Sequence, residues 1–118
     1  MQDQDHYVYV FVNEQLSWPQ RCVQTAHASI EAAKAFRFEC LPAHPYLVLL
    51  SAKNLQKLEN VRTHLEKLGI RYSCFYEEDR NGELTAIATE PIPEESTLRM
   101  SLRKYQLLKE REVLSQVA

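Results

Sequence analysis

The chain has 118 residues and a formal net charge of −2, from 14 lysines and arginines against 16 aspartates and glutamates. This length fits one core, so residues 1–118 are expected to form a single domain. The small negative charge argues against a protein that coats nucleic acid without selectivity. No apolar run approaches the roughly 20 residues of a membrane span, and the polar start MQDQDH lacks the pattern of a secretion signal.

The first half of the chain begins with an apolar, β-branched and aromatic run, Tyr7–Asn13, which predicts a strand covered on both faces. Ser17 is a suitable N-cap and Pro19 suits a first helical turn, so a helix is expected from there to about Phe36. Its apolar residues recur at helical spacing and predict a buried stripe of Val23, Ala26, Ile30 and Ala33.

A loop with Pro42 and Pro45 leads to a second buried strand, the run YLVLLSA. The next helix has Ser51 or Asn54 as its cap and Gly69 as its left-handed end. Its apolar positions are Leu55, Leu58, Val61, Leu65 and Leu68.

The second half predicts a hairpin followed by a helix. The strands IRYSCFYEE and ELTAIATE flank a turn at Asn81-Gly82, a dipeptide that tight hairpins prefer. A helix from about Ser96 to Leu114 is expected to end the chain. The order β-α-β-α-β-β-α predicts an α/β fold, a single three-layer domain whose four-stranded mixed sheet carries helices on both faces.

Several kinds of site are disfavoured by the residues that the chain lacks. With only two glycines there is no glycine-rich phosphate loop, so no cofactor is expected. The four histidines fall in four different elements, which argues against a metal site. The three cysteines are widely spaced and form no CxxC motif, which predicts free thiols and a cytoplasmic protein.

The stretch QRCVQTAHA contains the most informative polar pair, Gln24 and His27. Helical geometry places His27 about 80° from the centre of the predicted buried stripe, with Gln24 adjacent to it and farther towards solvent. From spacing alone, the simplest interpretation of His27 is a boundary residue with one satisfied nitrogen.

This stretch resembles the first-helix motif Lys-x-Ala-Ala-Gln-x-x-His-Ala of the type 2 peptidyl-tRNA hydrolases, with matches at Gln24, His27 and Ala28. The stretch NGELTAIATEP is similar to the family's last strand, with matches at Gly82, Thr85 and Pro91. The resemblance covers most of the chain and implies the same order of elements. It also implies peptidyl-tRNA as a partner, and homodimers as a possible assembly.

Two departures concern the site. Gln20 stands where the family has lysine, and Arg21 beside it points about 100° away on the helix. The family's segment Asp-Ala-Gly-Arg-Thr-Gln is replaced by the shorter YEEDRNG. In that segment Glu78 or Asp79 is the candidate carboxylate, and Arg80 is the candidate guanidinium.

Members of this family cleave the ester between a peptide and the 3′-terminal ribose of tRNA. The resemblance implies that His27 acts as base or positioning group, oriented by the hairpin carboxylate, while Thr85 donates a hydrogen bond. Gln20 can donate hydrogen bonds but brings no charge. Arg99 and Arg103, one turn apart in the last predicted helix, are candidates for phosphate contacts, although such pairs are more often a solvated helix face.

Two alternatives remain at the level of sequence. The same scaffold can serve as a binding or regulatory module whose active site has decayed; Gln20, the missing segment and the acidic hairpin favour this view. The chain can also be an unrelated α/β protein with a chance match in its first helix. A first helix that lies away from the hairpin would indicate the latter.

Overall fold

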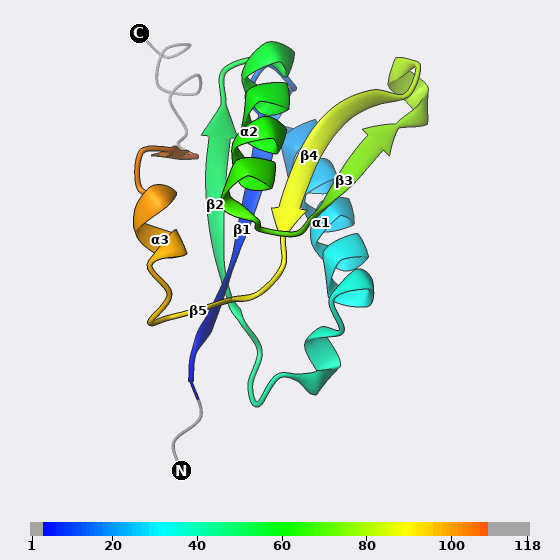
Figure 1. Ribbon diagram of the computed structural model, residues 1–118. Helices are drawn as coiled ribbons and strands as arrows, with labels where there is room; N and C mark the ends of the chain where they lie inside the picture. Colours follow the sequence, from blue (N-terminus) through cyan, green and yellow to red (C-terminus); the bar gives the residue numbers. More distant parts are fainter. Residues whose placement is uncertain (1–3, 109–118) are drawn as a thin grey trace, which may run out of the picture.

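The computed structural model describes residues 4–108 and has a mixed sheet with helices on both of its faces (Figure 1). The strands are β1 His6–Asn13, β2 Tyr46–Ala52, β3 Tyr72–Glu77, β4 Glu83–Thr89, β5 Ile92–Pro93 and β6 Gln106–Leu107. The helices are α1 Trp18–Ala35, α2 Leu55–Leu68 and the short α3 Leu98–Ser101, with 3-10 turns η1 Phe38–Cys40 and η2 Glu78–Arg80.

The sheet has six strands rather than the four expected from sequence. Five follow the order β3-β4-β1-β2-β6, and β5 pairs with the start of β1. β1 and β2 are parallel, whereas β4 runs antiparallel to both β1 and β3. The two additional strands have only two residues each, too few to show a strand pattern in sequence.

The expected last helix, Ser96 to Leu114, is wrong over the part that the structure describes. Only Leu98–Ser101 is helical there, and the chain then turns to pair Gln106–Leu107 with the edge of β2. The backbone N–H of Leu108 continues this pairing by donating to the carbonyl of Leu49. The remainder of the prediction, from residue 109, lies outside the described residues.

The predicted cap at Ser17 and glycine stop at Gly69 are confirmed, and of the two caps proposed for α2 the structure uses Asn54, since Ser51 lies within β2. Ser17 accepts a hydrogen bond from the backbone N–H of Gln20 and caps α1, while Asn54 caps α2. Gly69 ends α2 with a φ of 74°, in the left-handed region that favours glycine. None of the helices in the described range is long and apolar enough to cross a membrane.

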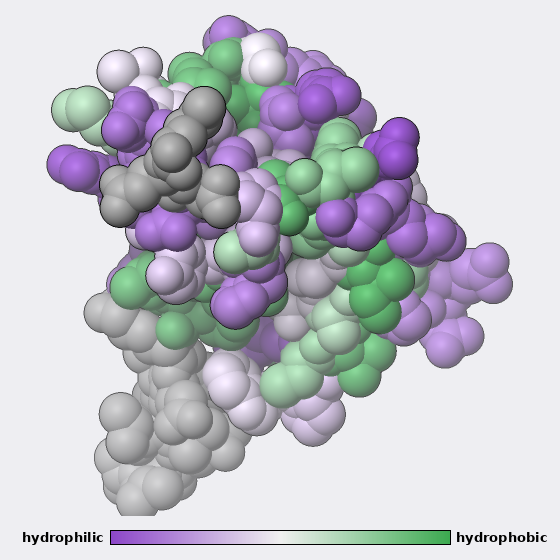
Figure 2. Space-filling model, turned by 90° about the horizontal axis from the view of Figure 1, so that it is seen from below, coloured by the Kyte–Doolittle hydropathy of each residue, from purple (hydrophilic) through white to green (hydrophobic). Residues whose placement is uncertain are grey.

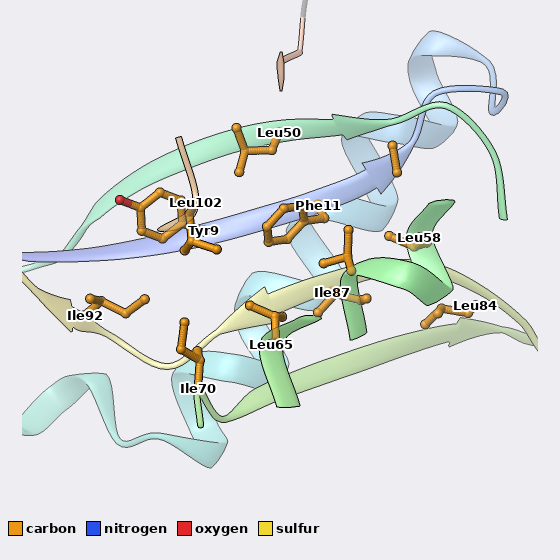
Figure 3. Packing of buried hydrophobic residues seen from close by; sticks show 12 residues of the cluster. Tyr9, Phe11, Leu50, Leu58, Leu65, Ile70, Leu84, Ile87, Ile92 and Leu102 are labelled. Atoms are coloured by element: carbon orange, nitrogen blue, oxygen red, sulfur yellow. The ribbon is translucent and has the colours of Figure 1, made fainter. Parts of the chain in front are cut away.

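The core has two layers, one on each face of the sheet. On the α2 side, Leu65 packs with Phe11 and Ile87 in a cluster of aliphatic and aromatic side chains (Figure 3). On the α1 side, the cluster consists mainly of valines and alanines from β1, β4 and α1. The small side chains there allow α1 to approach the sheet closely.

The buried stripe predicted for α1 is wrong: it lies on the exposed side of the helix. Val23 and Ile30 are 49% and 56% exposed, whereas the face against the sheet carries Arg21, Gln24, Ala28 and Ala32. β2 is also less covered than expected, since Leu47 is 59% exposed. Hydrophobic surface, coloured green, is visible among hydrophilic residues when the molecule is seen from below (Figure 2).

The two faces of α1 should respond differently to substitution. Ala32→Leu should lower the free energy of unfolding by about 1–3 kcal/mol, because the added atoms have no room between helix and sheet. Ile30→Ala should change it by less than about 0.5 kcal/mol, because that side chain is mostly exposed. Urea unfolding followed by circular dichroism measures both; a larger loss for Ile30→Ala would contradict this orientation of the helix.

Candidate active site

A surface cavity of about 380 Å³ lies between the first half of α1 and the end of the β3–β4 hairpin. Its walls come from the loop after β1, from α1, and from the segment that follows β3. The lining residues are Leu16, Pro19, Gln20, Val23, Gln24, Glu77, Asp79 and Arg80. The first helix therefore lies against the hairpin. A helix lying away from the hairpin would have indicated an unrelated fold with a chance match in α1, and the structure does not show that arrangement.

A chain of hydrogen bonds centred on Gln24 joins three elements beside this cavity. The Gln24 side-chain N–H donates to a carboxylate oxygen of Glu77 at 2.7 Å, and the Thr85 hydroxyl donates to the Gln24 carbonyl at 2.5 Å. The order of donors is chemically forced, because an ionised carboxylate can only accept. Gln24 is 4% exposed and Thr85 is fully buried. Buried polar atoms need hydrogen-bond partners, and these two bonds supply them.

A β-bulge directs Thr85 towards α1. Phe75 pairs with Ala86 while Tyr76 pairs with Leu84, so Thr85 is the additional residue on β4. Leu84 packs on the α2 side and Ala86 on the α1 side. Thr85 reaches Gln24 and therefore shares the α1 side with its neighbour Ala86, which strict alternation along a strand forbids.

The carboxylate in the network is Glu77, which was not among the acids predicted from the sequence. Of the two predicted acids, Asp79 lines the cavity and its backbone N–H donates to Glu77 at 3.4 Å, while Glu78 is exposed and outside the lining. The hydrogen bond from Gln24, then that from Asp79 and the nearby charge of His27, lower the pKa of Glu77. Phe75 packs towards α1, and a period of two from that residue would have identified Glu77.

Gln20 lines the cavity from the first turn of α1, and its side chain stabilises the start of that helix. Its side-chain carbonyl accepts the backbone N–H of Ser17 at 3.1 Å, and its own backbone N–H donates to the Ser17 hydroxyl at 3.3 Å. This reciprocal pair is a capping box. The residue at the position of the family's lysine therefore stabilises the start of the helix and places no charge in the cavity.

Arg21 does not take the place of that missing charge at the cavity wall. It is 3% exposed, is not among the lining residues, and its guanidinium lies 4.9 Å from the centre of the Trp18 ring. The cation that does line the cavity is Arg80, which is held by Glu83 at 3.4 Å. Among the described lining residues, Arg80 is therefore the one that brings a guanidinium to the cavity.

His27 is exposed and is not among the residues that line the cavity; it follows the lining residues Val23 and Gln24 by one turn of α1. Its ring stacks on Phe75 with centroids 4.5 Å apart and planes 2° from parallel. Its charge reaches Glu77, although the direct hydrogen bond of that carboxylate goes to Gln24. The imidazole is therefore accessible and fixed in orientation, with an acid nearby.

The two arginines predicted for phosphate contacts lie elsewhere. Arg99 donates to the Tyr9 hydroxyl at 3.0 Å and covers the Tyr7 ring at 3.7 Å, on the face of the sheet that α2 covers. Arg103 is exposed in the turn after α3. Figure 1 shows α3 beside β2, across the sheet from the β3–β4 hairpin. Neither arginine contributes to the cavity.

The described residues contain no group of three or more His, Cys, Asp or Glu side chains placed to hold a metal ion. The site offers an accessible imidazole, an ionised carboxylate, a guanidinium, and a buried amide that joins the carboxylate to the Thr85 hydroxyl. This set can move a proton and oppose a developing negative charge.

Comparison with known proteins agrees with this arrangement. The chain matches none of the curated proteins at a significant level. Residues 6–108, however, match the family described as Peptidyl-tRNA hydrolase PTH2, and this range includes every element and every side chain of the site above. The chain therefore belongs to the type 2 peptidyl-tRNA hydrolase family.

Proposed function

We propose that the protein hydrolyses the ester between a peptide and the 3′-terminal ribose of tRNA at the cavity beside Gln24. The observation that carries this proposal is the chain from Thr85 through Gln24 to Glu77 along the wall of an open cavity, in a member of this family. We propose further that residues 1–118 act as one domain and that the site is a divergent one.

In the proposed reaction, His27 takes a proton from the water that attacks the ester carbonyl. It returns this proton to the ribose 3′ oxygen as the bond between that oxygen and the acyl carbon breaks, and Glu77 stabilises the imidazolium that exists between the two transfers. The lowered pKa of Glu77, caused first by its hydrogen bond from Gln24, keeps this carboxylate ionised and makes it a poor base. Arg80 opposes the negative charge that develops on the ester oxygen. Gln24 and Thr85 are positioning residues, because the Thr85 hydrogen is already engaged with Gln24.

Release of peptide from an N-blocked peptidyl-tRNA tests this function. Wild type should release the peptide, and His27→Ala should reduce the rate by about 10²-fold or more, since a general base typically contributes 10²–10⁴-fold. His44→Ala is the matched control, because His44 is exposed in the loop before β2. Circular dichroism checks the fold of both variants. A folded wild type without release at high enzyme concentration would refute the hydrolase.

A second candidate function, a binding module with impaired activity, is favoured by Gln20. Its side chain is neutral and engaged in the capping box, so the cavity lacks the charge that the family's lysine would supply. In this case a folded wild type would bind uncleaved peptidyl-tRNA, and changes at His27 or Gln24 would leave binding unaltered.

Restoring the lysine should separate the two candidates. Gln20→Lys should raise kcat by about 10²-fold, the typical value of one charge placed at a developing oxyanion. It should also cost roughly 1 kcal/mol of stability, because the hydrogen bond from the Ser17 backbone N–H to the Gln20 side chain is lost, while the bond from the backbone at position 20 to the Ser17 hydroxyl remains. Gln20→Met is the control, since it loses the same hydrogen bond without adding charge. Equal kcat values for the two variants would show that a cation at this position does not limit the reaction.

The hydrogen bonds to Glu77 should also appear as a pH-dependent stability. Its pKa is lowered from 4.5 in the folded protein, so its contribution is present above that pH and is lost as pH falls through the folded-state value. Thermal unfolding should therefore show Glu77→Gln less stable than wild type at pH 7, and the difference should disappear at low pH. Glu78→Gln, at an exposed carboxylate, should behave like wild type. A pH-independent difference would contradict this assignment.

A further inference from the structure

A second and larger cavity lies on the opposite face of the sheet from the candidate active site. It has a volume of about 610 Å³ and is formed by α2, the end of β2, and the segment that leads into β6. Four exposed amines line it: Lys53, Lys57, Lys67 and Lys104. Within the described part of the chain, its walls carry no aspartate or glutamate. We refer to it as the lysine groove.

The sign of charge is segregated along α2. Lys57 and Lys67 face the groove, whereas Glu59 and Glu66 lie on the other flank, towards β3. There Glu59 pairs with Arg62 at 3.3 Å, and Glu66 accepts a 2.5 Å hydrogen bond from the Tyr72 hydroxyl. The acids of the helix are thus engaged away from the groove. Glu14, which accepts a hydrogen bond from the lining residue Ser51, offsets only part of the positive charge of the four lysines.

The groove is elongated and suits a chain of negative charges. Lys57 and Lys67 are ten residues apart on α2, which corresponds to about 15 Å along the helix axis. One strand of a nucleic acid duplex carries a phosphate about every 3.4 Å along its axis, so this length faces about four phosphates. Lysine supplies the point charges that such contacts need. A compact anion would use only one end of the groove.

Neutral hydrogen-bonding groups lie between the lysines. His64 and the Tyr105 hydroxyl are 2.6 Å apart, with Asn60 and Gln106 beside them in the lining. Burial, then the charges of Lys104 and Lys67, lower the pKa of His64, which reports the positive field inside the groove. Amide and hydroxyl groups at these places are suited to ribose hydroxyls, which carry both donor and acceptor.

We infer that the lysine groove binds the sugar–phosphate backbone of RNA at a contact separate from the candidate active site. The choice of RNA over other polyanions rests on the proposed function. The charge and shape of the groove are observed independently of that function. Both cavities lie where the parallel strands end: Leu16 follows β1, and Ser51 and Ala52 end β2. One nucleic acid therefore has access to both across this edge of the sheet.

Fluorescence anisotropy with a labelled, unstructured RNA of twelve nucleotides tests the inference. Lys57→Gln/Lys67→Gln should weaken binding at least tenfold, and the slope of log affinity against log salt should become shallower by about 1.4, at about 0.7 per phosphate contact. Lys34→Gln/Arg37→Gln removes the same charge from exposed positions at and just beyond the end of α1 and should bind like wild type. Binding should also raise the pKa of His64, measured by NMR.

Three outcomes would overturn the inference: no RNA binding by wild type, equal loss in both double variants, or a loss confined to anionic vesicles of phosphatidylcholine and phosphatidylserine. A minimal substrate, an N-acylated aminoacyl ester of adenosine, separates this result from the proposed function. Lys57→Gln/Lys67→Gln should cleave it like wild type while its KM for full peptidyl-tRNA rises. If wild type cleaves neither substrate yet the groove variant loses RNA binding, the proposed hydrolase fails and the groove stands.

Discussion

The site depends on the close packing of α1 against β1 and β4. Alanines and valines in this layer let the helix approach the sheet, and the approach brings a buried amide within reach of a strand hydroxyl and a hairpin carboxylate. Burying Gln24 without partners would cost a few kcal/mol, so its two hydrogen bonds are a condition of the packing. The same contacts that allow the helix to be buried therefore also assemble the polar network.

Much of the fold follows from local signals in the sequence. β1, both long helices, the hairpin, the caps at Ser17 and Asn54 and the stop at Gly69 were all predicted from residue patterns. The orientation of α1 was not, because the rule that the most apolar stripe faces the core fails where alanines form the contact. The short strands β5 and β6 could not be predicted either, since tertiary pairing with β1 and β2 defines them.

The candidate site was predicted in part. The sequence pointed to Gln24, His27, Thr85 and an acid near the turn, and the structure brings this region together. The prediction selected Glu78 or Asp79 instead of Glu77, because it followed the uncertain register of the shortened hairpin and not the alternation of β3 from Phe75. Nor could it foresee the bulge at Thr85 or the use of Gln20 in a capping box, which depend on strand pairing and on helix-end geometry.

The insertion of β4 between β1 and β3 has a consequence for biogenesis. The bond between Thr85 and Gln24 joins residues 61 positions apart, and β1 cannot acquire its β4 neighbour until the hairpin has been synthesised. On a ribosome, the parallel β1–β2 pair and both long helices emerge first and lack that neighbour. Contacts of such high sequence separation form slowly because a long loop must close. A nascent chain therefore holds no completed network until translation has passed β4.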